Sequence, residues 1–319
     1  MAQNITKDLN PTYGSIQKLH SRDTNLIALC ENKCLKILID KNALFNADGE
    51  SQLLSTSNVL GEATPFIGEY GISTDPESFA SESYRAYFTD RKNGVVLRLS
   101  QDGLTPISQV GMSDYFKDNL RGAYRLIGSH DDYKDNYNLT IDRGEPTSSN
   151  TISFNESVKG WISFKSFIPE NGISIAGDYH TFFKGKAYKH HSNPVRNIFY
   201  GDALATGSSL RSSVTVLLND SSDLVKNFKT LSYEGSQARI VSNDQDNDYY
   251  NLNGKTGWYV DYIVTNEGEV GEENGSLNEF IEKEGKWFNY IRGHNVDSVD
   301  LADFTHQGMG GSSNKSNSI

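Results

Sequence analysis

The chain has 319 residues and a formal net charge of −11, from 30 basic and 41 acidic side chains. This acidic balance argues against a nucleic-acid backbone as the main ligand, because such binding depends on clustered Lys and Arg. No run of about 18 apolar residues occurs, so we expect no membrane insertion, and the first residues lack the basic and apolar regions of a secretion signal.

The composition favours short strands over long helices. Glycine is abundant (28 residues), proline is scarce (7 residues), and Asn, Asp and Ser occupy most breaks between apolar runs. These residues form tight turns between strands. The many Tyr and Phe side chains, 17 and 15, supply the material for a core.

Residues 1–24 are predicted to be an amino-terminal segment that precedes the folded domain. The first strand–turn–strand unit follows, with strands over Asn25–Cys30 and Cys34–Asp40. Its two cysteines, Cys30 and Cys34, are the only ones in the chain. We expect both thiols to be free and packed as small apolar groups, because a structural zinc site needs four ligands and no secretion signal is present.

The clearest unit is Tyr84–Ser108, YRAYFTDRKNGVVLRLSQDGLTPIS. Apolar and polar residues alternate roughly over Tyr84–Phe88 and Val95–Leu99, as in half-buried strands. Asn93-Gly94 supplies the positive φ of a hairpin turn, and Gln101–Gly103 supplies a second turn. The stretch therefore predicts a three-stranded meander.

The same pattern recurs about every 35 to 50 residues, which is typical of repeat architectures. The further units are Arg125–His130 with Tyr137–Ile141, Thr151–Phe154 with Trp161–Phe164, Asp178–Phe183 with Ala187–His191, and Ser213–Leu218 with Phe228–Glu234. The repeats predict an all-β fold, a β-propeller-like series of antiparallel meanders over residues 25–240. A β-sandwich with a similar number of hairpins is the alternative.

Residues 241–305 differ in character and are predicted to be a carboxyl-terminal extension. Gly257–Thr265 reads as a strand, and Ser276 with Glu279 forms a capping box that predicts a short helix. Residues 306–319 hold almost no core-forming side chain and predict a flexible tail.

The extension also contains the predicted partner-docking residues, chosen because aromatic side chains dominate interface energetics. They are Phe280, Ile281, Trp287, Phe288, Tyr290 and Ile291. The alternative is that these side chains close the core of their own domain.

No catalytic, cofactor-binding or metal-ligating residue is predicted. The sequence lacks a nucleophile elbow, a phosphate-binding Gly-rich loop, a dinucleotide fingerprint and a His-Glu-x-x-His helix. His190 and His191 are neighbours in a predicted strand, so we expect their rings on opposite faces. The acidic loops Asp131–Asn136 and Asn243–Asp248 offer oxygen ligands for calcium, but they lack the spacing of an EF-hand and predict solvated turns.

Two aromatic clusters admit a carbohydrate-stacking role, but in strands such residues are more often core. They are Trp161, Phe164 and Phe167, and Trp258, Tyr259 and Tyr262.

Several stretches, in this order, carry a resemblance to a known family. They are SFASESYRAYFTDRKNGVVLRLSQDGLTPIS (Ser78–Ser108), GMSDYFKDNL (Gly111–Leu120), GWISFKSFIPENGIS (Gly160–Ser174), NIFYG (Asn197–Gly201), FKTLSYEGS (Phe228–Ser236) and EFIEKEGKWFNYIRG (Glu279–Gly293). Together they resemble the large virion structural proteins of tailed bacteriophages, especially contractile-tailed phages of marine cyanobacteria.

The resemblance implies a non-enzymatic component of the tail or baseplate, located in the virion and assembled in the host cytoplasm. Its expected partners are other virion proteins in an oligomeric assembly, and no cofactor is expected. Two other functions are weighed against this one. A module that binds host surface glycans would show an exposed aromatic shelf, and a glycan-degrading enzyme would show two carboxylates converging in a cleft.

Overall fold

The computed structural model divides the chain into two compact units, residues 1–194 and 195–319. The residues it describes are 6–22, 25–45, 51–145, 148–193, 198–200, 211–218, 221, 223–224, 230–234, 257–265, 268–269, 281–283, 286–290 and 309–315. No helix among them is long and apolar enough to cross a membrane.

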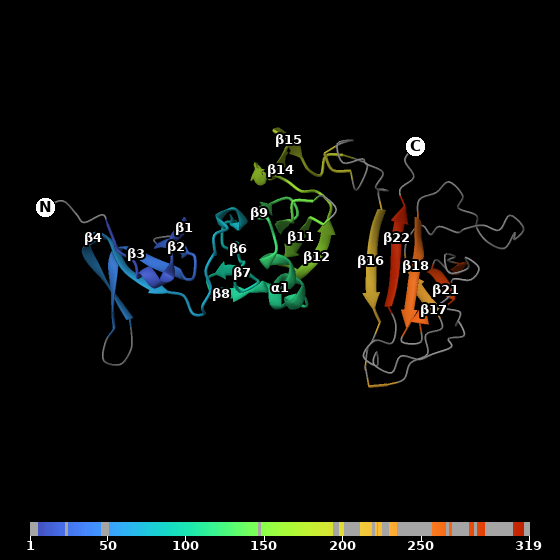
Figure 1. Ribbon diagram of the computed structural model, residues 1–319, viewed down its shortest axis with the longest axis horizontal. Helices are drawn as coiled ribbons and strands as arrows, with labels where there is room; N and C mark the ends of the chain where they lie inside the picture. The colour runs from blue at the N-terminus through green and yellow to red at the C-terminus, as the bar shows by residue number, and fades with distance from the viewer. Residues whose placement is uncertain are drawn as a thin grey trace, which may run out of the picture. The chain divides into compact units, whose positions relative to one another are not determined.

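The described part of the first unit contains four antiparallel sheets, and three of them have four strands in sequence order. Figure 1 shows these sheets one after another along the unit. Sheet A consists of β1 (Ile16–Arg22), β2 (Asn25–Cys30), β3 (Cys34–Phe45) and β4 (Ser51–Pro65). Sheet B consists of β5 (Ala80–Ser81), β6 (Ala86–Asp90), β7 (Val95–Ser100) and β8 (Gly103–Pro106). Sheet C consists of β9 (Arg125–Asp131), β10 (Asn136–Asp142), β11 (Asn150–Asn155) and β12 (Gly160–Lys165). Sheet D consists of β13 (Asn171–Ile175), β14 (Asp178–Phe183) and β15 (Lys186–Lys189).

These sheets confirm the predicted all-β, propeller-like series of meanders in this unit. The predicted unit Tyr84–Ser108 contains β6, β7 and β8. Gly94 and Gly103 have φ of 69° and 99°, so both turns use the left-handed conformation that glycine adopts without strain.

Successive sheets bury their faces against one another because alternate residues of a strand point to opposite faces. In β6, Ala86 and Phe88 pack with Ile27 and Leu29 of sheet A. Tyr87, between them, packs into the core shared with sheet C. Sheet B is thus covered on both faces by apolar cores.

In the described residues, four short helices accompany the sheets. They are α1 (Ser113–Arg121) and the 3-10 helices η1 (Pro11–Tyr13), η2 (Pro76–Ser78) and η3 (Ile107–Gln109). The helix α1 was not predicted. It buries Phe116 and Leu120, one turn apart on the same side, in the core between sheets B and C.

Both cysteine thiols are free and buried, as predicted. Cys34 packs with the apolar residues between sheets A and B, and Cys30 packs on the other face of sheet A. Burial raises the pKa of both thiols, so each is held in its neutral form.

The predicted boundaries of the first domain are corrected at both ends. The predicted amino-terminal segment, residues 1–24, contains β1, which pairs with β2. At the other end the first unit stops at Pro194 rather than at residue 240. The predicted hairpin of Ser213–Leu218 with Phe228–Glu234 does not form, because β16 (Arg211–Leu217) pairs with β22 (Met309–Lys315) and β17 (Thr230–Tyr233) pairs with β21 (Lys286–Tyr290).

The second unit contains two antiparallel sheets in its described residues. One has the strand order β16, β22, β18 (Gly257–Thr265) and β19 (Gly268–Glu269), and the other has β17, β21 and β20 (Ile281–Lys283). The strand predicted over Gly257–Thr265 is confirmed as β18.

Two predictions for the carboxyl-terminal region differ from the structure. Within the predicted tail, residues 306–319, Met309–Lys315 form β22 between β16 and β18. Backbone hydrogen bonds to two neighbours do not require large side chains, so a Gly- and Ser-rich segment can serve as a central strand. Residues 276–280 of the predicted short helix lie outside the described residues, and Ile281 belongs to β20.

Candidate functional site

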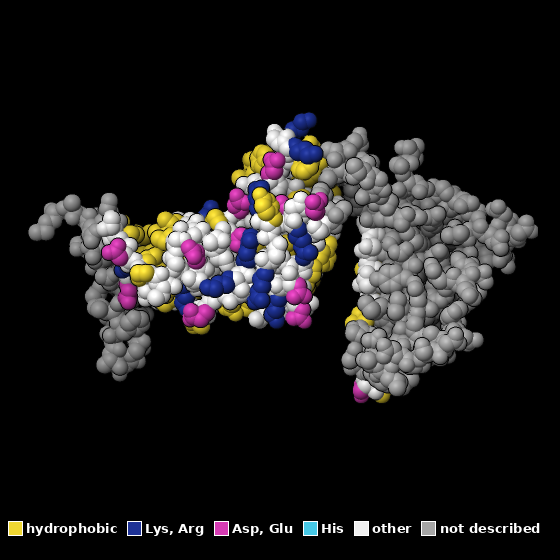
Figure 2. All heavy atoms as spheres, in the orientation of Figure 1, with side chains coloured by type: hydrophobic (Ala, Val, Ile, Leu, Met, Phe, Trp, Pro, Cys, Tyr) yellow, Lys and Arg dark blue, Asp and Glu magenta, His cyan; other side chains and the backbone are white. Residues whose placement is uncertain are grey.

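The outer face of sheet D exposes three large apolar side chains. We call Ile173, Ile175 and Phe182 the D face; their exposed fractions are 50%, 56% and 38%. Ile173 pairs with His180 and Ile175 with Asp178, so β13 and β14 lie side by side beneath this surface. Figure 2 shows hydrophobic side chains exposed around β14 and β15.

The inner face of sheet D is closed against sheet C. Gly172 lies so near Ser129 of β9 that a Cβ atom would approach the Ser129 Cβ to 2.8 Å. The Ser129 and Tyr179 hydroxyls form a buried hydrogen bond of 2.7 Å. Ser174 donates to the carbonyl of His130 (2.8 Å). Sheet D therefore has one covered face and one open apolar face.

The predicted docking residues lie partly in the second unit's three-stranded sheet. Phe280 and Ile291 fall outside the described residues, while Ile281 is in β20 and Trp287, Phe288 and Tyr290 are in β21. The sheet places Ile281 opposite Phe288 and Tyr233 opposite Trp287. Phe288 is half-buried.

The first of the two aromatic clusters considered for sugar stacking lies in β12 and in the segment that follows it. Two of its three aromatic residues are core. Phe167 is 1% exposed. Trp161 packs on Phe116 and Phe154, and its Nε1 donates to the Ile107 carbonyl (3.1 Å). Phe164 is exposed and meets Tyr115 edge-on. Trp258, Tyr259 and Tyr262 lie in β18.

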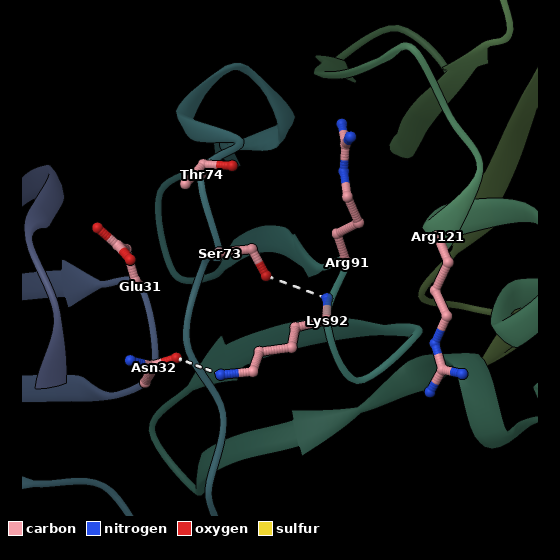
Figure 3. Close-up of a pocket in the computed structure, with 7 residues that line it drawn as sticks. All are labelled: Glu31, Asn32, Ser73, Thr74, Arg91, Lys92 and Arg121. Atoms are coloured by element: carbon pink, nitrogen blue, oxygen red, sulfur yellow. Dashed lines mark hydrogen bonds between the residues drawn. The ribbon is translucent and has the colours of Figure 1, made fainter. Parts of the chain in front are cut away.

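A cavity of about 410 Å³ lies between the β2–β3 turn, the β6–β7 turn and the end of α1 (Figure 3). Three of its lining residues are cationic: Arg91, Lys92 and Arg121. Lys92 donates to Asn32 (3.0 Å), whereas Arg91 and Arg121 extend in opposite directions in Figure 3. Arg91 donates to the Ala123 carbonyl and pairs with Asp75. The cations do not converge on one point, so the cavity is a polar junction and not a built anion site.

A second cavity, of about 210 Å³, contains both neighbouring histidines. The sequence predicts opposite faces for His190 and His191, but β15 ends at Lys189 and His191 has φ of 61°. The strand alternation stops there, and both rings line the same cavity, 6.1 Å apart. A left-handed backbone at a non-glycine residue gives little signal in a sequence.

The acidic turn Asp131–Asn136 lies beside this cavity. It is not simply a solvated turn, because Asp131 is 1% exposed. One carboxylate oxygen of Asp131 accepts from the backbone N–H groups of Tyr133 and Lys134 (3.1 and 3.2 Å), and the other lies 2.8 Å from His191 Nε2. The second acidic loop, Asn243–Asp248, lies outside the described residues.

The imidazole of His191 is held by a carboxylate, and proton transfer in enzymes uses this arrangement. The serine that lines the cavity, Ser192, donates its hydroxyl to the Lys189 carbonyl (3.1 Å) and so is not placed as a nucleophile toward His191. Lys189 is paired with Asp178 (2.5 Å). Among the described residues, each cavity is lined by one carboxylate: Glu31 lines the first cavity and Asp178 lines the second.

We predict that His190 makes the stability of the first unit sensitive to mild acid. Burial, then the nearby His191, lowers the pKa of His190 to about 4. The unfolded chain, with a His pKa of about 6.5, therefore binds the proton first, and stability is lost as the pH falls from about 6.5 towards 4. Because the ring is only half-buried, we expect a loss of about 1 kcal/mol between pH 7 and pH 5.

Urea unfolding of the wild type and of His190→Gln at both pH values measures this effect. Gln keeps a polar group near Thr181, which now contacts His190 Nε2 at 2.7 Å, but it does not titrate. The variant should lose about 1 kcal/mol less than the wild type. Equal losses in the two proteins would contradict the prediction.

No family model matches the chain, and no curated protein matches it.

Proposed function

We propose that the chain is a non-enzymatic structural component of a tailed-phage virion, in the tail or baseplate, that acts by binding other virion proteins in an oligomeric assembly. The resemblance noted in the sequence supports this proposal. Of the stretches that carry it, Ser78–Ser108 covers all four strands of sheet B, and Gly160–Ser174 runs from β12 into β13.

The observation that carries the proposal is the open D face. Apolar cores lie between sheets A and B and between sheets B and C, whereas Ile173, Ile175 and Phe182 of sheet D are 50%, 56% and 38% exposed. Contiguous exposed apolar side chains on one sheet are typical of interaction surfaces, because burying them in a complex is favourable. An apolar sheet face that its own unit leaves exposed favours a partner that presents an apolar sheet face of its own.

The test uses purified particles of the phage that encodes the chain. Mass spectrometry of these particles should detect the chain, and its absence would overturn the virion proposal. Complementation with Ile173→Thr plus Ile175→Thr then tests the D face. Threonine preserves β-branching, so the strand should form as before while apolar area is lost.

We expect the double variant to keep the wild-type unfolding transition and to enter particles at least about tenfold less, which corresponds to about 1.4 kcal/mol of binding. Val158→Thr is the matched control, because Val158 is 66% exposed in the β11–β12 turn, away from the D face. The same assay on Trp287→Ala plus Phe288→Ala tests the predicted carboxyl-terminal surface. Normal incorporation of the D-face variant would remove that face from the proposal.

A further inference from the structure

Three residues that commonly bind metal ions meet at the junction between sheets B and C. Glu82 follows directly after β5, His130 is in β9, and Asp135 is in the β9–β10 turn. One ligand atom from each side chain lies within 4.8 Å of the others. It is the one group of three or more His, Cys, Asp or Glu ligands with this geometry in the described part of the chain.

The imidazole of His130 is fixed in the orientation that a metal ligand needs. Its side chain is 7% exposed, and its Nδ1 lies 2.8 Å from the Asp132 carboxylate. The Tyr87 ring stacks on it nearly parallel, at 8°. Its Nε2 lies 3.6 Å from Asp135 Oδ1, which is too long for a hydrogen bond. This nitrogen thus faces the Asp135 carboxylate.

This arrangement matches the way proteins orient ligating histidines. One ring nitrogen donates to a carboxylate, which fixes the tautomer, and the other nitrogen binds the metal. In this site Asp132 would take the outer position, with Nδ1 donating to it. His130 Nε2, Glu82 and Asp135 would form the inner set.

The charges around the cluster favour the binding of a cation. Glu82, Asp132 and Asp135 bring three carboxylates together. The nearby cation is Arg85, whose guanidinium donates to Glu82 Oε1 (2.5 Å) and also approaches Glu156 (3.8 Å). Since Arg85 contacts one oxygen of Glu82, the other remains for a metal ion.

We infer that Glu82, His130 and Asp135 bind a divalent first-row transition ion of the zinc type. One imidazole and two carboxylates are ligands that such ions accept, whereas calcium requires six or more oxygens. Ligands about 2.1 Å from a tetrahedral ion lie about 3.4 Å apart, so the group must contract by about an ångström. Asp135 is 56% exposed and free to make this movement, and it leaves the site open to solvent.

The bound ion would link two neighbouring meanders. Glu82 lies in the β5–β6 turn of sheet B, while His130 and Asp135 belong to the β9–β10 hairpin of sheet C. This site is separate from the D face and does not depend on the proposed virion role.

Calorimetric titration of the purified chain with Zn²⁺, Co²⁺ and Ca²⁺ tests the inference. We expect one equivalent of Zn²⁺ or Co²⁺ to bind, no competition from Ca²⁺, and an absorption spectrum of four- or five-coordinate Co²⁺. Asp135→Asn should weaken Zn²⁺ binding at least tenfold. Asp132→Asn should weaken it by about 10- to 100-fold through the orientation of His130.

Two controls separate this site from other metal binding. Asp102→Asn removes an exposed carboxylate of the β7–β8 turn and should leave the affinity unchanged. His191→Gln removes the competing imidazole of the second cavity and should also have no effect. The inference is overturned if Zn²⁺ binds Asp135→Asn as tightly as wild type, if His191→Gln abolishes the binding, or if Ca²⁺ displaces Zn²⁺.

Discussion

Gly128→Ala is expected to lower the free energy of unfolding of the first unit by about 3 kcal/mol or more. Gly128 lies in β9 opposite Leu139, and a Cβ atom there would be 1.9 Å from the carbonyl oxygen of Ser78. Such a separation is far inside van der Waals contact, so either β9 or η2 must move.

Ser78 is held too firmly to move at low cost. Its carbonyl accepts from the Tyr137 hydroxyl (2.9 Å), and its own hydroxyl donates to the Asp75 carbonyl (2.8 Å) and accepts from the backbone of Thr89 (3.1 Å). A shift of η2 would strain these buried hydrogen bonds, and each buried group left unpaired costs about 1–3 kcal/mol.

Urea unfolding of Gly128→Ala and Gly122→Ala measures the difference. Gly122 ends α1 with φ of −89°, and nothing lies within 4 Å of the Cβ that alanine would add. We expect that control to unfold like the wild type. Similar stabilities of the two variants would mean that η2 can move away from sheet C at little cost in free energy.

The sequence predicted local pairings better than distant ones. Hairpins such as β6–β7 and β14–β15 were predicted because their turns contain the residues that the backbone conformation requires, Gly94 and Gly185 with φ of 69° and 70°. The partners of β16 and β17 lie far along the chain, and no turn residue marks them. Their pairing depends on tertiary contacts that hydrophobic periodicity does not report.

The same contrast between local and distant features applies to the candidate sites. The acidic turn beginning at Asp131 was noticed as a ligand-rich segment, but the sequence does not show that β5 brings Glu82 beside it. The cavity shared by His190 and His191 was missed because a single left-handed residue overrides the alternation expected of a strand. The D face was missed because alternation indicates that a strand has two faces but not which of them a neighbouring sheet covers.

Glu156→Ala is expected to lower the free energy of unfolding by about 3 kcal/mol. The Glu156 side chain is 11% exposed in the β11–β12 turn. It accepts from the Tyr87 hydroxyl (2.8 Å) and from the guanidinium of Arg98 (2.9 Å), which pair across β6 and β7. The carboxylate thus ties two strands of sheet B to a turn of sheet C.

Removal of this carboxylate leaves the Tyr87 hydroxyl and the Arg98 guanidinium without this partner, while Arg85, which lies 3.8 Å from Glu156, keeps its ion pair with Glu82. The cost arises mostly from the uncompensated charge of Arg98, whose side chain is 21% exposed, and from the desolvated hydroxyl. Replacing the charged pair together, as Glu156→Leu plus Arg98→Met, should therefore cost less than the single change to alanine. Glu156→Gln should be intermediate, because its amide oxygen still accepts from Tyr87.

Chemical unfolding of these variants, with Glu62→Ala as a control, measures the contribution. Glu62 is exposed in β4, and its removal should change stability by no more than about 0.5 kcal/mol. If Glu156→Ala costs no more than Glu62→Ala, water must satisfy Arg98 and Tyr87 in its place. The junction of sheets B and C would then depend on its apolar core, in which Tyr87 stacks on Tyr137 at 4.8 Å, rather than on the charged pair.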